Sequence, residues 1–198
     1  MKGDADIGWA AVFLLAAFAI EVTGFFVSNS LCLMADSFFI FAEFLFFLMV
    51  FYRLKSKGAC AFTLVSSLAV FLSGLFIIYL AVYRFVFGSV VAGIEVPVFA
   101  LAGLAAGAYA IRKAGKLYNP KKTKDSLVHV LRKTVSSLLV ISGGVWIAFT
   151  GEVFVDYLFG VLIGFAVMFE ALLLFRDSSC LLLEGRKSET RLFKNVKQ

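Results

Sequence analysis

Residues 8–28 read GWAAVFLLAAFAIEVTGFFVS, and residues 31–52 read LCLMADSFFIFAEFLFFLMVFY. A membrane-spanning α-helix needs about 20 mostly apolar residues, and each run has that length with only one or two acidic side chains. Comparable apolar runs, bounded by charged or turn-forming residues, follow at 60–84, 90–111, 126–150 and 153–175. No run alternates apolar and polar residues with the period of two that is typical of a transmembrane β-strand. We therefore expect an all-α, polytopic membrane protein, with a bundle of six transmembrane helices within residues 1–185.

The composition excludes an ordinary water-soluble protein. Hydrophobic residues make up 62% of the 198-residue chain and charged residues 16%, whereas a soluble domain has roughly 45–50% apolar and 25% charged residues. Once six spans of about 20 residues are assigned, no room remains for a sizeable soluble domain. Beyond the bundle we expect only a short basic cytoplasmic tail at residues 186–198.

Lysine and arginine are unevenly divided between the two ends of the predicted spans. They occur in the N-terminal tail and after the second, fourth and sixth spans, whereas the three opposite turns hold at most Arg84. Because cytoplasmic connections are richer in Lys and Arg, both termini are expected in the cytoplasm. The net charge of +6 comes from short basic stretches beside the spans. These stretches predict contact with anionic headgroups of the lipid bilayer and no binding of nucleic acid.

Several ionisable residues lie within the predicted spans. A charge inside the hydrocarbon region is costly and usually faces the bundle interior, so each is a candidate functional residue. Asp36 and Glu43 share one face of the second span, and His129 and Lys133 share one face of the fifth. The remaining residues are Arg132, Glu170 and Glu21, and for the two glutamates we expect either hydrogen bonds to neighbouring helices or a side chain that reaches an interface.

These residue types allow two interpretations. In the first, Glu43 and Lys133 form a buried ion pair that fixes the packing, with His129 beside it and Asp36 capping or pairing near the outer end of the second span. In the second, the polar faces line a pathway where carboxylate and imidazole replace the water around a divalent cation, in competition with protons. No nucleophile–base pair, phosphate-binding loop or cofactor fingerprint is present, so we expect neither an enzyme nor a tightly bound cofactor.

Three segments resemble, in order, motifs of the cation diffusion facilitator family. Residues 30–43, SLCLMADSFFIFAE, resemble its second span, with the pattern S-L-A-L-L-A-D-A-x-H-x-x-x-D. Residues 127–137, LVHVLRKTVSS, resemble its fifth span, with the pattern H-V-L-x-D-x-x-x-S. The sixth span and its exit, with DYL at 156–158, RDS at 176–178 and LLLE at 181–184, resemble D-P-L, R-E-S and L-L-E. The resemblance extends over residues 8–185.

Resemblance to this family implies a homodimer of six-helix subunits that exports zinc or a related divalent cation from the cytoplasm in exchange for protons. The tetrahedral site of such proteins takes an H/D-x-x-x-D pair from the second helix and another from the fifth. The matching positions here are Phe39, Glu43, His129 and Lys133. Because Phe39 has no donor atom and Lys133 carries an ammonium group, Glu43 and His129 remain as expected metal ligands, with Asp36 as a further oxygen donor.

These departures from the pattern lead to two functional hypotheses. The first is a divalent-cation transporter with an altered site. The alternative is a transport-inactive relative that acts as a partner or regulatory subunit, with an ion pair between Glu43 and Lys133 in place of the metal. The family usually continues into a ferredoxin-like cytoplasmic domain, which we expect to be absent here. A homodimer, or a heteromer with another membrane protein, would then form through the membrane helices.

Overall fold

The computed structural model describes residues 2–53, 59–115 and 123–195, with side chains described mainly within 8–45, 64–110 and 133–176. These residues form six α-helices and no β-strand. The helices are α1 (Lys2–Ser28), α2 (Leu31–Arg53), α3 (Ala59–Phe87), α4 (Glu95–Gly115), α5 (Thr123–Thr150) and α6 (Phe154–Asn195). The prediction of an all-α fold is confirmed.

Four of the described helices contain stretches that are long and apolar enough to cross a membrane. These stretches are Gly8–Ser28, Leu64–Phe87, Lys133–Thr150 and Phe154–Arg176. The apolar part of α4, Glu95–Ala110, is shorter. The fourth span was expected from residue 90, but the helix begins at Glu95 because residues 88–94 form the connection from α3. The acidic side chain of Glu95 suits the positive end of the helix dipole in the first turn.

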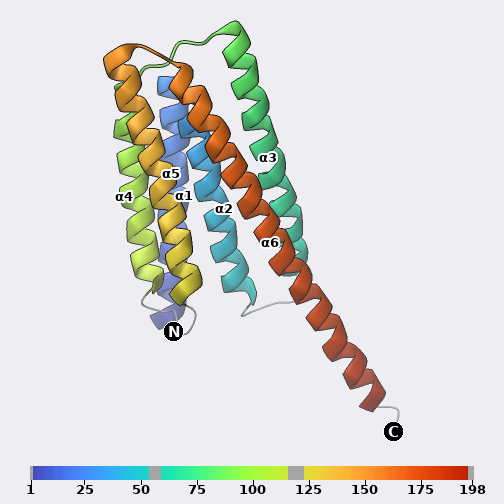
Figure 1. Ribbon diagram of the computed structural model, residues 1–198. Coiled ribbons are helices and arrows are strands. Elements are labelled where there is room, and N and C mark those ends of the chain that lie inside the picture. Colours follow the sequence, from blue (N-terminus) through green and yellow to red (C-terminus); the bar gives the residue numbers. More distant parts are fainter. Residues whose placement is uncertain (1, 54–58, 116–122, 196–198) are drawn as a thin grey trace.

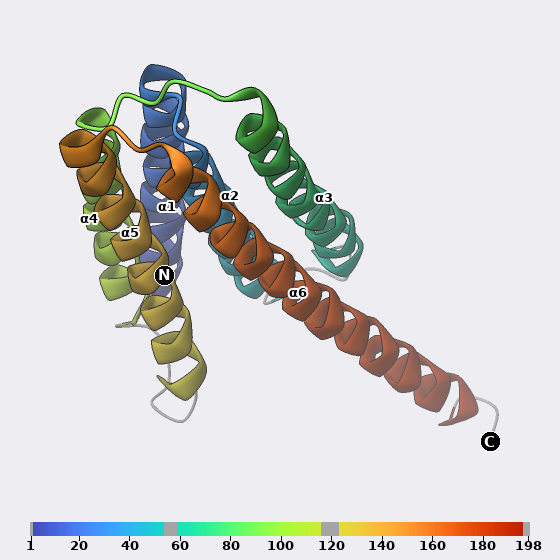
Figure 2. The same ribbon diagram turned by 45° about the horizontal axis from the view of Figure 1, so that its top comes forward.

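The helices form a group of four with a pair beside it. In Figures 1 and 2, α1, α2, α4 and α5 stand together, while α3 lies apart from α1, α4 and α5 and packs mainly against α6. Helix α2 contacts each of the other five helices. The N-terminus and the C-terminal end of α6 lie at the same end of the bundle, and the last part of α6 projects beyond it as a continuous helix (Figure 1). The residues expected as a tail are therefore helical as far as Asn195.

Three helices, α1, α3 and α5, end in the same way at the other end of the bundle. The residues that follow them adopt left-handed backbone conformations, with φ of 57° at Asn29, 75° at Gly88 and 73° at Gly151. Each donates its backbone N–H to the carbonyl four residues earlier, at 2.7–2.8 Å. Glycine adopts this conformation without steric cost, and Asn tolerates it better than most residues. Local sequence thus terminates these helices and turns the chain back.

The start of α2 is held by a carboxylate from α6. Buried Asp156 accepts hydrogen bonds from the Ser30 hydroxyl at 2.6 Å, from the Leu31 N–H at 2.6 Å and from the Cys32 N–H at 3.1 Å. The Ser30 hydroxyl in turn accepts the N–H of Leu33 at 3.3 Å. These bonds satisfy the first three N–H groups of α2, which have no partner within the helix. They also join the beginnings of α2 and α6.

Arg84 connects the same turn to α3. Its guanidinium donates to the backbone oxygen of Asn29 at 2.7 Å and to the Asn29 side-chain oxygen at 2.8 Å. The Asn29 amide donates to the carbonyl of Val90 at 2.8 Å. The α1–α2 turn, the end of α3 and the connection that follows it are therefore tied together, which fixes the upper end of α2.

Replacing Asp156 by Ala should lower the free energy of unfolding by at least about 2 kcal/mol, because two buried backbone N–H groups lose their acceptor. Thermal unfolding of the purified protein in detergent measures the effect. Glu152→Ala is the matched control, since Glu152 is an exposed carboxylate in the α5–α6 turn. Equal midpoints for the two variants would show that the Asp156 contacts contribute nothing to stability.

Candidate functional site

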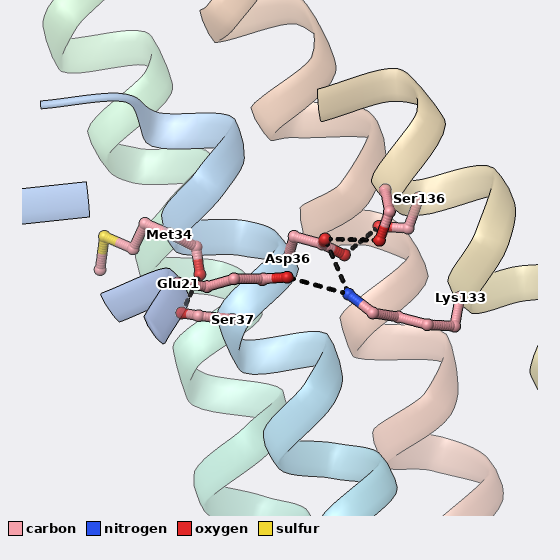
Figure 3. Close-up of polar contacts among 7 residues, drawn as sticks. Glu21, Met34, Asp36, Ser37, Lys133 and Ser136 are labelled. Carbon is pink, nitrogen blue, oxygen red and sulfur yellow. Dashed lines mark hydrogen bonds and ion pairs between the residues drawn. The ribbon is translucent and has the colours of Figure 1, made fainter. Parts of the chain in front are cut away.

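A buried ammonium group lies at the centre of the four-helix group. Lys133, on α5, is only 1% exposed. Its Nζ donates to Asp36 Oδ2 of α2 at 2.7 Å and to Glu21 Oε1 of α1 at 3.4 Å (Figure 3). All three side chains are withdrawn from solvent and lipid, so the positive charge is compensated within the protein.

Two serines complete the surroundings of the Asp36 carboxylate. Ser136 donates to Oδ1 at 2.7 Å and Ser137 donates to Oδ2 at 2.9 Å. Together with the ammonium of Lys133, Asp36 accepts three hydrogen bonds, all from α5. Figure 3 shows this side chain of α2 directed at α5, with Glu21 approaching from the opposite side. Hydrogen bonds of this kind offset the loss of water around a buried carboxylate.

Glu21 reaches the cluster past the backbone of α4. A Cβ at Gly103 would collide with Glu21 Oε1, so the absence of a side chain at Gly103 makes room for the carboxylate. Glu21 is fully buried, and its Oε2 has no hydrogen-bond partner within the described part of the chain. The cluster therefore combines one ammonium with two carboxylates, one fully hydrogen-bonded and one only half satisfied.

The expected ion pair between Glu43 and Lys133 is wrong. Lys133 pairs with Asp36 and Glu21, while neither carboxylate oxygen of Glu43 has a hydrogen-bond partner among the described residues. Glu43 is nonetheless buried, at 7% exposure. Asp36, near the start of α2, is thus a residue that pairs with the lysine.

The register between α2 and α5 explains the choice of partner. Ser136 and Ser137 contact Asp36, so these residues lie at one level of two antiparallel helices. Lys133 then lies about 5 Å along the axis from the level of Asp36 and about as far from that of Glu43, at 1.5 Å per residue. The ammonium bonds on the Asp36 side, where Glu21 supplies a second oxygen acceptor.

The remaining predicted site positions are less fully described. Phe39 is buried between the levels of Asp36 and Glu43 and offers no donor atom. His129 and Arg132 lie on α5, but their side chains are outside the described residues. Glu170 of α6 is buried as well. No three His, Cys, Asp or Glu side chains in the described part of the chain gather closely enough to hold a metal ion.

Sequence reasoning did not place three members of the cluster. Glu21 was assigned only hydrogen bonds to neighbouring helices or a side chain that reaches an interface, yet it forms part of the ion-pair cluster. Ser136 and Ser137 were not singled out, although both lie within the stretch that resembles the fifth span of the family. The one sequence signal for Glu21 is that it is the single charge within residues 8–28.

Comparison with models of known protein families identifies the family of this chain. The model of the cation efflux transmembrane domain matches residues 9–183. The chain belongs to the cation efflux family. The match extends over all of α2 to α5 and most of α1 and α6, in agreement with the resemblance expected over residues 8–185. No curated protein with a matching sequence was found. Family membership and the four long apolar helices together identify an integral membrane protein.

Replacing Asp36 by Asn should lower the free energy of unfolding by about 3 kcal/mol, the lower end of the cost of breaking a buried ion pair, because Glu21 still compensates Lys133. The matched control is Glu43→Gln, the same change of carboxylate to amide on the same face of α2. Since Glu43 has no bonded partner to lose, its variant should be as stable as the unmodified protein or more so. Thermal unfolding measures both variants. A loss in Glu43→Gln as large as that in Asp36→Asn would contradict the pairing described.

Proposed function

We propose that this cation efflux family member exports a divalent, zinc-like cation from the cytoplasm in exchange for protons. Family membership supports cation efflux in general. The choice of zinc as substrate and the coupling to protons are what the family resemblance implies, and they are supported by the carboxylate and imidazole that remain at the family positions, Glu43 and His129. The proposal includes cytoplasmic termini, which is supported by the Lys and Arg residues in the connections on the same side of the spans as the termini.

The observation that carries the proposal is the environment of Glu43. Both of its carboxylate oxygens are buried and lack a hydrogen-bond partner among the described residues. A buried carboxylate without a partner is costly, so it takes up either a proton or a cation. Binding of a metal ion would release the proton, and binding of a proton would release the metal. This exchange is the elementary step of an antiporter.

Lys133 does not oppose a cation at Glu43 as strongly as its position in the family pattern suggests. An unpaired ammonium about 3.5 Å from a divalent ion would repel it by roughly 9 kcal/mol at an effective dielectric constant near 20. Here the ammonium bonds to Asp36 and Glu21, so its charge is compensated locally. In the proposed transporter, Glu43 and His129 are the protein ligands, and water completes the shell of the ion.

The second candidate function is a transport-inactive partner or regulatory subunit. It is favoured by Phe39 and Lys133, which supply no ordinary ligand at two of the four family positions. Such a subunit would act as a heteromer with another membrane protein, whereas the proposed transporter would act as a homodimer through its membrane helices. Stable copurification with a second membrane protein, together with an absence of metal binding, would favour this alternative.

Zinc binding by isothermal titration calorimetry tests the proposed function. The protein in detergent should bind zinc more tightly as the pH rises from about 6 to 8.5, because His129 loses the proton that competes with the metal. Glu43→Gln and His129→Ala should each weaken binding by at least about tenfold, equivalent to 1.4 kcal/mol. Glu152→Gln, which changes an exposed carboxylate, should bind as the unmodified protein does.

Zinc uptake into vesicles that contain the purified protein should be measured for the same variants. Zinc flux with opposite proton movement is expected, and it should be lost in Glu43→Gln. Absence of zinc binding at every pH in this range would rule out the proposed transporter.

A further inference from the structure

The ammonium of Lys133 lies where oxygen atoms of three helices converge. Asp36 Oδ2 and Glu21 Oε1 contact it directly, at 2.7 and 3.4 Å. The hydroxyls of Ser136 and Ser137 adjoin the Asp36 carboxylate. Glu21 Oε2, fully buried and without a described partner, is a further oxygen atom available to a ligand. Figure 3 shows the side chains of Glu21, Asp36 and Lys133 directed toward one another, with Ser136 beside the Asp36 carboxylate. Without the lysine, this cluster would hold two uncompensated carboxylates.

Lys133 also has a second acceptor within reach. Its Cα lies about midway between the levels of Asp36 and Glu43, about 5 Å from each along the helix axis. Asp36 and Glu43 are two helical turns apart and lie on the same face of α2. The flexible four-carbon stem of lysine allows its ammonium to turn toward either carboxylate. Glu43 has both oxygens unoccupied in the described structure.

We propose that the oxygens of Asp36, Glu21, Ser136 and Ser137 form a cation site that the tethered ammonium of Lys133 fills, and that a hard divalent cation enters this site when the ammonium turns to Glu43. The site differs from the metal site of the proposed function in position and in ligands. Its described donors are all oxygen atoms, with no imidazole or thiolate, so it suits Mg²⁺, Ca²⁺ or Mn²⁺ better than zinc.

The lysine makes the two sites mutually dependent. With the ammonium at Asp36 and Glu21, the carboxylate of Glu43 is open to a cation or a proton. With the ammonium at Glu43, the oxygen-only site is open instead. Lys133 therefore acts as an internal competitor for whichever carboxylates it contacts, and its removal should expose the oxygen-only site.

Manganese binding to the full chain in detergent, followed by electron paramagnetic resonance, tests this inference. Lys133→Met keeps an unbranched side chain of similar length, one atom shorter, but removes the ammonium group, and it should bind one Mn²⁺ at least about tenfold more tightly than the unmodified protein does. In the Lys133→Met background, Asp36→Asn should abolish this gain. Glu43→Gln in that background is the matched control and should preserve it.

The outcomes separate this inference from the proposed function. Mn²⁺ binding that depends on Asp36 but not on Glu43 supports the oxygen-only site, whatever the zinc measurements give. No gain in Lys133→Met, or a gain that is lost in the Glu43→Gln control and kept with Asp36→Asn, overturns it. Zinc binding that depends on Glu43 would in that case still stand.

The test remains decisive if Lys133→Met does not fold in the absence of a divalent cation. Lys133→Met leaves two buried carboxylates uncompensated, so it can aggregate in the absence of a divalent cation. Addition of Mn²⁺ during purification should then restore a monodisperse protein. If Mn²⁺ fails to do so while Lys133→Met with Asp36→Asn folds without any cation, the carboxylates are buried but form no cation site, and the inference is overturned.

Discussion

The ion pair between Lys133 and Asp36 is the constraint on which the arrangement of the helices depends. An ammonium group in the interior of a membrane protein must be compensated by the protein itself, since neither water nor lipid tails can do so. Asp36 supplies the closest negative charge, at 2.7 Å. Glu21 adds a second, and it reaches the ammonium because Gly103 leaves space for it. One buried cation thereby sets how α1, α2, α4 and α5 stand relative to one another.

Helix α2 is bonded to neighbouring helices at its start and at Asp36 but, among the described residues, not at Glu43. At its start, Asp156 of α6 accepts two backbone N–H groups and the Ser30 hydroxyl. One and a half turns further on, Asp36 is bound by α5. Glu43, two turns below Asp36, has no such partner in the described part of the chain. Two carboxylates on the same helix face are therefore distinguished by their surroundings. Asp36 accepts three hydrogen bonds from α5, whereas the oxygens of Glu43 have no described partner.

This arrangement explains how the fifth helix accommodates a lysine at position 133, where the family pattern has a carboxylate. In the family pattern that position carries a carboxylate that helps to hold a metal ion. Here the position carries a covalently attached cation, and its charge is taken up by Asp36 and Glu21 from neighbouring helices. The interior thus keeps a bound positive charge near the family site, but moves it about one turn along α2. The ammonium is bonded to Asp36 and Glu21, so the carboxylate oxygens of Glu43 have no hydrogen-bond partner among the described residues.

The sequence by itself determined the all-α class, the positions of most helices, the family and the candidacy of Glu21, Asp36, Glu43, Lys133 and Glu170 as ionisable residues of the interior, all of which are buried. Apolar runs, the residues that end helices, such as Gly88 and Gly151, and the order of short motifs are all local properties of the chain. The tertiary structure alone decided which charges pair. Glu43 and Lys133 were a reasonable pair from helix faces, yet Asp36 and Glu21 are the partners. Face periodicity defines the direction of a side chain around its own helix. Face periodicity carries no information on the relative axial positions of two helices. For a side chain as long as lysine, these positions and the surrounding charges together select the partner.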